Sequence, residues 1–214
     1  MKKEKNQIII CICLALLSIV YTLLVKYVDV QAIGPNGSLV GFASINKIIF
    51  NLTGVNMLLY HITEWLGIIP IFMVFIYAFI GLIQAIKRKS ILMVDKKIIV
   101  LGVFYIVVLG IYVLFEKVAI NYRPVLINNV LEASYPSSHT LLSICVCGSS
   151  IMINNMLYKN IKIFKIENVV SIILILLIVI GRLVSGVHWF SDIIGSIIIS
   201  IALLKILKTA FNKC

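Results

Sequence analysis

Three ionisable side chains interrupt an otherwise apolar stretch near the C-terminal end of the sequence. They are Arg182, His188 and Asp192, within residues 181–192. His188 and Asp192 are four residues apart, so on one helix they would share a face and the carboxylate could hydrogen-bond the imidazole. A carboxylate orients a histidine in this way for nucleophilic catalysis. We therefore expect His188 to be catalytic, with Asp192 as its partner.

Two upstream patches add polar side chains that suit phosphate chemistry. Residues 116–124 contain a glutamate, a lysine and an arginine, and residues 135–139 contain two serines and a histidine: Glu116, Lys117, Arg123, Ser137, Ser138 and His139. Arginine guanidinium groups match the oxygens of a phosphate, and a helix starting near Ser137 would direct free N–H groups at an anion. In such a site His188 could attack phosphorus while His139 protonates the departing oxygen.

The same patches lack the side chains that would hold a catalytic metal ion. No cluster of carboxylates suited to magnesium or zinc accompanies the histidines. We therefore expect a site without a metal or another cofactor, in which basic side chains stabilise the developing negative charge.

The composition predicts an all-α integral membrane protein. Hydrophobic residues make up 62% of the 214 residues, charged residues 13%, and the mean hydropathy is +1.13. The net charge of +11 could suggest nucleic acid as a partner. No basic stripe with interleaved aromatic residues is present, however, so we expect no nucleic acid and assign the basic residues to contacts with membrane lipids.

Hydropathy predicts six membrane-spanning helices in a single domain, 1–214. The expected spans are residues 7–25, 66–86, 98–115, 140–157, 169–187 and 193–207. Between the first two spans, apolar residues recur at helical spacing over 45–52, which is typical of an interfacial helix. His61 and Glu64 lie three residues apart before the second span, and we interpret them as a polar pair at the interface.

Charge placement predicts the orientation of these spans. If the N-terminus is cytoplasmic, fourteen of the nineteen Lys and Arg residues fall in inner segments. We therefore expect both termini in the cytoplasm. The three polar patches then lie together at the outer, extracytoplasmic face, where they form one candidate active site.

The three patches resemble the signatures of the type 2 phosphatidic acid phosphatase superfamily, which read K-x6-R-P, P-S-G-H and S-R-x5-H-x3-D. The third is present at its full spacing from Arg182 to Asp192, with Gly181 in place of the serine. The second is present as residues 136–139, with Ser138 in place of the glycine. In the first, Arg123 is followed by proline as the signature requires. Its lysine position holds a glutamate, Glu116, and Lys117 lies one residue late.

The resemblance implies a role for each matching position. His188 would form a phosphohistidine, Asp192 would orient it, and His139 would act first as general acid and then as base. The phosphoryl oxygens would be bound by the side chains of Arg123, Arg182 and Ser137, by the backbone N–H of Ser138 and by Lys117.

The expected function is hydrolysis of a lipid phosphomonoester or diphosphate at the outer face of a membrane. Substrates of the family include undecaprenyl diphosphate, phosphatidylglycerol phosphate and phosphatidic acid, and the sequence leaves all three open. The composition and size favour a bacterial cell membrane protein. Two alternatives remain: a phosphotransferase that uses the same residues, and a non-catalytic protein that binds or transports lipid, which the altered first signature would allow.

Overall fold

The computed structural model describes residues 2–214, and helices account for all its regular structure apart from isolated β-bridges. The long helices are α1 (Lys2–Tyr27), α4 (Ile68–Lys87), α5 (Lys96–Lys117), α6 (Ser138–Leu157), α7 (Lys162–Val184) and α8 (Phe190–Phe211). The shorter elements are α2 (Ala43–Thr53), α3 (Met57–Leu66) and the 3-10 helices η1 (Pro35–Gly37) and η2 (Ile91–Met93). The prediction of an all-α protein is confirmed.

Six segments of the described chain are long and apolar enough to cross a membrane, as predicted. They are Glu4–Tyr27, Met57–Lys87, Lys96–Lys117, Ser138–Leu157, Lys162–Val184 and Phe190–Phe211. The second span differs from the prediction, because it begins nine residues before residue 66 and is formed by α3 and α4 in succession. The predicted fifth span was also too long at its C-terminal end, since α7 ends at Val184 and a turn precedes α8.

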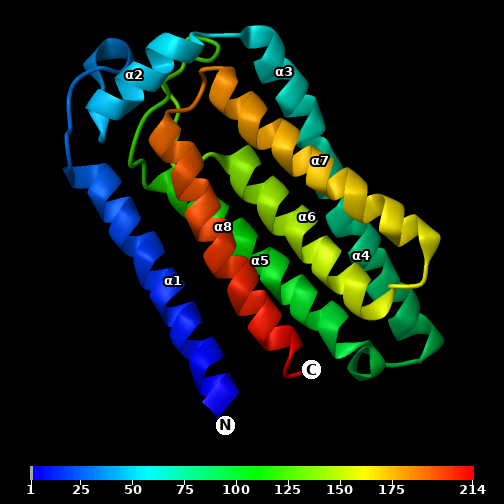
Figure 1. The fold of residues 1–214 in the computed structure, drawn as a ribbon. Coiled ribbons are helices and arrows are strands. Elements are labelled where there is room, and N and C mark those ends of the chain that lie inside the picture. The colour runs from blue at the N-terminus through cyan, green and yellow to red at the C-terminus, as the bar shows by residue number, and fades with distance from the viewer. Residues whose placement is uncertain (1) are drawn as a thin grey trace.

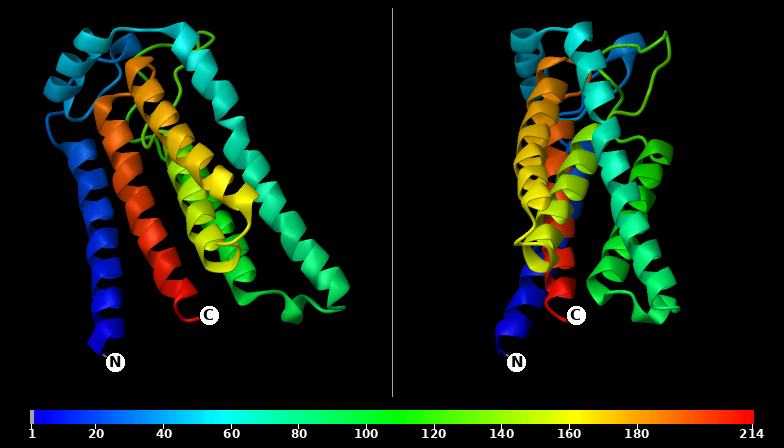
Figure 2. Two further views of the ribbon diagram at one scale, coloured as in Figure 1. Left: turned by 45° about the vertical axis from the view of Figure 1, so that its right-hand side comes forward. Right: turned by 90° about the vertical axis from the view of Figure 1, so that its right-hand side faces the viewer.

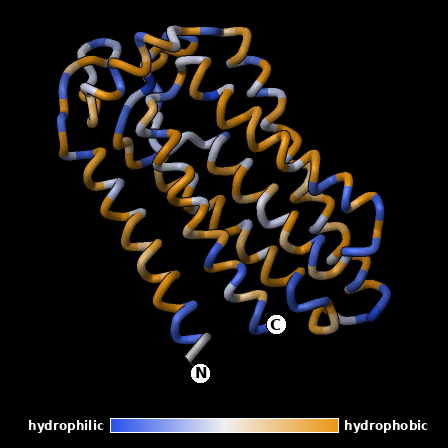
Figure 3. The backbone as a smooth tube through the Cα atoms, in the orientation of Figure 1, coloured by the Kyte–Doolittle hydropathy of each residue, from blue (hydrophilic) through white to orange (hydrophobic). Residues whose placement is uncertain are grey.

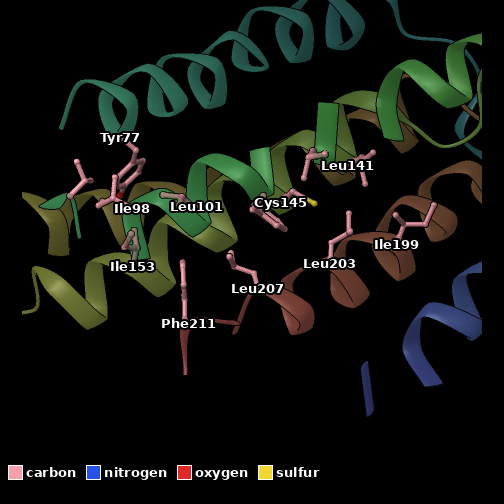
Figure 4. Packing of buried hydrophobic residues seen from close by; sticks show 13 residues of the cluster. Tyr77, Ile98, Leu101, Leu141, Cys145, Ile153, Ile199, Leu203, Leu207 and Phe211 are labelled. Carbon is pink, nitrogen blue, oxygen red and sulfur yellow. The ribbon is translucent and has the colours of Figure 1, made fainter. Parts of the chain in front are cut away.

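The helices form a bundle around α6, which packs against α4, α5, α7 and α8 (Figures 1 and 2). Helix α1 lies at the edge of the bundle and packs against α8. The largest apolar cluster joins α4, α5, α6 and α8 through side chains such as Leu101, Leu141 and Leu203 (Figure 4). Apolar residues dominate the long helices (Figure 3), and many of their large apolar side chains are exposed. A polar side chain buried in the packed interior is therefore a candidate for a functional role.

Both termini lie at one end of the bundle, as an even number of spans requires (Figure 1). The opposite end carries α2, the loop from residue 118 to residue 137 and the turn between α7 and α8. Helix α2 covers the predicted interfacial segment 45–52. Following the charge-based orientation, this second end is called the outer end below.

Two buried amide side chains connect the segments of the outer end by hydrogen bonds. Asn46 of α2 donates to the Ser191 hydroxyl at 2.9 Å and accepts from the Ser191 N–H at 3.0 Å. Asn121 of the loop accepts from the Gly41 N–H at 3.0 Å and donates to Asp192 at 3.2 Å. Both asparagines are fully buried, so these bonds replace water and hold the start of α8 in place.

Candidate active site

His188 lies in the turn between α7 and α8. It is therefore not part of a helix, in contrast to the prediction. Its Nδ1 lies 3.0 Å from the carbonyl oxygen of Ser134 and 4.0 Å from Oδ2 of Asp192. The prediction of a hydrogen bond between Asp192 and His188 within one helix is wrong, because α7 ends before His188 and α8 begins only at Phe190. The loop backbone takes the place of the carboxylate as the partner of the imidazole.

The Ser134 carbonyl determines which nitrogen of His188 is available for chemistry. A carbonyl can only accept, so Nδ1 carries the proton and Nε2 carries the lone pair. Nε2 is buried and has no hydrogen-bond partner among residues 2–214. Burial, together with the positive charges of Arg123 and Arg182, lowers the pKa of His188 well below its ordinary value. The imidazole is thus held as a neutral base with Nε2 unoccupied.

Asp192 holds the backbone that carries His188. Its Oδ2 accepts from the Trp189 N–H at 2.9 Å and from the hydroxyl of Ser134, and Oδ1 lies 3.2 Å from the amide of Asn121. The bond to Trp189 connects a carboxylate in the first turn of α8 to the backbone of the residue before the helix. Because Ser134 contacts both Asp192 and His188, the carboxylate orients the imidazole through the loop. Neither Ser134 nor Asn121 stood out in the sequence, since Ser134 lies outside the three signatures and Asn121 occupies an unspecified position of the first one.

Arg182 lies near the end of α7 with a fully buried side chain. Its Nη2 donates to Oε1 of Glu64, and its guanidinium lies 5.1 Å from the centre of the Tyr60 ring. Nε and Nη1 have no partner in the described chain. An unpaired buried donor is costly, so these two nitrogens favour an anionic ligand in the site.

Two other predicted residues also lie beside glutamates. Nε2 of His139, in the first turn of α6, is 3.5 Å from Oε1 of Glu64. The interpretation of Glu64 as a partner of His61 was therefore wrong. Nε of Arg123 lies 3.0 Å from Oε2 of Glu132, while its Nη1 is buried without a partner in the described part of the chain. Each arginine thus keeps at least one donor available for a further anion.

The remaining predicted phosphate ligands differ in their placement. Ser137 is fully buried as the residue before α6, and its hydroxyl donates to Thr140 at 3.1 Å. Ser138 begins α6, where backbone N–H groups lack helical partners. Lys117 is exposed at the end of α5. Glu116 instead lines a small cavity together with Ser138 and His188. The glutamate at the signature's lysine position is therefore the residue that borders the site.

A large apolar cavity of about 1340 Å³ opens beside these residues. Its walls come mainly from α3, α4, α5 and α6, and it extends from Ile127 at the outer end to Ile91 and Val94 near the opposite end. Glu64 and His139 line it where it meets the polar residues. An apolar cavity that ends in a basic cluster has the shape and chemistry to hold an amphipathic anion.

Gly186 gives the turn the conformation that His188 requires. Its φ is +67°, and a Cβ at this position would lie 1.9 Å from the backbone oxygen of Gly54. We expect Gly186→Ala to reduce both thermal stability in detergent and catalytic activity. The positive φ costs about 1–2 kcal/mol, and relief of the clash must displace the turn.

Gly37→Ala is the matched control for this substitution. Gly37 has a φ of +73°, but a Cβ there would meet nothing within 4 Å. This variant should lose stability without loss of activity per folded molecule. Equal effects of the two substitutions on activity would contradict a specific role for the turn.

The fold defines an all-helical, multi-pass membrane protein, and sequence comparison matches part of the chain to a family model. Residues 116–214 match the sequence model of the PAP2 superfamily and contain all three signature patches. This part of the chain is similar in sequence to the PAP2 superfamily.

Two similar proteins illustrate the relationship. The crystal structure of the first transmembrane PAP2 type phosphatidylglycerolphosphate phosphatase from Bacillus subtilis superposes with a TM-score of 0.59. It is 19% identical, and the match covers 95% of this chain and 96% of that chain, so the likeness concerns the fold. Lipid phosphate phosphatase delta of Arabidopsis thaliana is 28% identical over 88 residues, which are 40% of this chain and 21% of that protein. The alignment thus spans about a fifth of that relative.

Proposed function

We propose that this protein is a membrane lipid phosphatase that works without a metal ion and forms a phosphohistidine at His188. The observation that carries the proposal is the state of His188: Nδ1 is tied to a backbone carbonyl, and Nε2 is buried and unpartnered in the described chain. A neutral imidazole with a free Nε2, bordered by two arginines, is prepared to attack an electrophilic anion. The match of residues 116–214 to the PAP2 superfamily model supports phosphate as that anion.

In the first step the Nε2 lone pair of His188 attacks phosphorus, and the bond from phosphorus to the leaving oxygen breaks. His139 donates a proton to that oxygen, so the lipid leaves as an alcohol, or as a monophosphate from a diphosphate. Arg123 and Arg182 neutralise the phosphoryl oxygens, and each has at least one buried nitrogen without a hydrogen-bond partner among residues 2–214. The Ser134 carbonyl keeps hold of the Nδ1 proton, which stabilises the positive charge that develops on the imidazole.

In the second step His139, now unprotonated, accepts a proton from water. The resulting hydroxide attacks phosphorus, the nitrogen–phosphorus bond breaks, and the electron pair returns to Nε2 of His188. Inorganic phosphate is released, and both histidines return to their starting protonation states. The proton that left with the lipid is thus replaced by one from water.

The large cavity supports a lipid as the substrate. Apolar side chains of α3 to α6 line most of it, while Glu64 and His139 mark the end that meets the basic residues. A phosphate bound at the arginines would leave its hydrocarbon tail in this cavity, where burial of apolar surface contributes affinity. The named phosphatases among the similar proteins act on lipid phosphates, which agrees with this class.

The proposal is tested by phosphate release from a panel of lipids. The purified full-length protein, in detergent with EDTA, is incubated with phosphatidic acid, phosphatidylglycerol phosphate and undecaprenyl diphosphate. We expect EDTA-resistant release of inorganic phosphate from at least one of them. Loss of all activity in EDTA, with recovery on addition of Mg²⁺ or Zn²⁺, would overturn the metal-independent mechanism. Transfer of the phosphoryl group to an alcohol without release of phosphate would favour a phosphotransferase.

A further inference from the structure

We propose that Glu64 is a specificity-determining residue: its carboxylate occupies the phosphoryl site of the free protein and must be displaced by the substrate. The inference deepens the proposed function and rests on it. Oε1 of Glu64 accepts from Nη2 of Arg182 and lies 3.5 Å from Nε2 of His139. A single carboxylate oxygen therefore contacts both the proposed phosphate ligand and the proposed general acid.

The substrate and this carboxylate compete for the same volume. A phosphoryl oxygen on Nη2 of Arg182, with the leaving oxygen at Nε2 of His139, would need the place that Oε1 of Glu64 now holds. The two groups also repel each other, because a phosphomonoester carries about two negative charges near neutral pH. A bound phosphate and an inward Glu64 side chain are thus mutually exclusive at these two nitrogens.

Exposure indicates which of the three side chains can move. The Arg182 side chain is 0% exposed and that of His139 is 23% exposed, whereas that of Glu64 is 37% exposed. His139 is further confined by Gly67, where a Cβ would lie 2.3 Å from the imidazole Cδ2. Glu64 lies where the large cavity meets the polar residues, and as the most exposed of the three side chains it can turn away from the basic groups. Glu64 is therefore the side chain that moves when phosphate binds.

This arrangement links the tail of a substrate to recognition of its phosphate. Displacing Glu64 costs the free energy of a charged hydrogen bond, which phosphate must recover from the same donors. A lipid gains additional free energy when its tail fills the cavity, and part of this binding energy can drive the displacement. Inorganic phosphate has no tail, so it must displace the Glu64 carboxylate without this additional binding energy. Glu64 would thereby favour lipid phosphates and limit inhibition by the released product.

The test compares the inhibition constant of inorganic phosphate for wild-type protein and Glu64→Gln. The assay measures the dephosphorylated lipid rather than phosphate, because phosphate is the inhibitor. Glutamine keeps an acceptor for Arg182 but removes the charge, so the variant should fold. We expect inorganic phosphate to inhibit Glu64→Gln about tenfold more strongly, as the loss of one charge-assisted hydrogen bond implies, and the KM for the lipid to fall.

Glu116→Gln is the matched control, because it removes the same charge from the edge of the site. Glu116 lines the small cavity beside His188, but no hydrogen bond or ion pair of its carboxylate occurs in the described chain. A rise in phosphate inhibition that is confined to Glu64→Gln supports competition for the site. An equal rise in both variants would overturn the proposal, because it would show a general effect of charge.

Two further outcomes separate this inference from the proposed function. If Glu64→Gln lowers kcat and leaves phosphate inhibition unchanged, Glu64 positions His139 and Arg182, and the competition proposal is wrong. If wild-type protein turns over no lipid, the proposed function fails. Binding of inorganic phosphate by calorimetry then still tests Glu64: tighter binding by the glutamine variant supports competition, and unchanged binding refutes it.

Discussion

We expect replacement of His188 by alanine to remove nearly all release of phosphate from every lipid substrate of the wild-type protein. The substitution removes Nε2, the proposed nucleophile, so turnover should fall by a factor on the order of 10³ or more. The remaining basic residues can still bind the substrate, so KM should change far less than kcat. Initial rates of phosphate release in detergent, normalised to folded protein, measure this effect.

The protein supplies its own control for a histidine substitution. His61 is the one histidine of the three in the sequence that lies outside the candidate active site; it is exposed on α3 and contacts the ring of Tyr60. His61→Ala should leave kcat within about a factor of three, as expected for a surface substitution. If His188→Ala, with unchanged thermal stability, kept wild-type turnover, the phosphohistidine mechanism would be wrong.

Replacing His139 by asparagine is expected to trap the phosphorylated protein. The loss of a general acid or base lowers rates by about 10² to 10⁴. With an alkyl phosphate the first step needs the acid, so turnover falls without accumulation of an intermediate. With an aryl phosphate the leaving group departs without help, and only the attack of water is slowed. Acid-labile, base-stable radiolabel should then accumulate on His188.

The double variant His139→Asn, His188→Ala is the control for this trapping experiment. It lacks the nucleophile, so it should take up no label from either substrate. Label that survives in the double variant would place the phosphoryl group on another residue. Equal loss of activity with alkyl and aryl substrates, without any label in His139→Asn, would contradict the role of His139 as general acid.

The sequence predicted the six spans because the length and apolarity of each helix are local properties. Its least accurate prediction concerned the second span, which begins at Met57 rather than at residue 66. Residues 57–66 include His61, Thr63 and Glu64, and these polar side chains lowered the hydropathy. Thr63 and Glu64 are accommodated by neighbours on other elements. Thr63 is buried against Gly181, and Glu64 is paired with Arg182.

The sequence by itself determined the class of protein and the chemistry available to it. Apolar helices of membrane length require a helical bundle, and the spaced histidines and arginines identified the PAP2 signatures. Only the tertiary structure decided how those residues are held. The partner of His188 is a carbonyl 54 positions away, and the partner of Arg182 is a carboxylate 118 positions away. Such contacts depend on how helices and loops pack, and no local pattern encodes them.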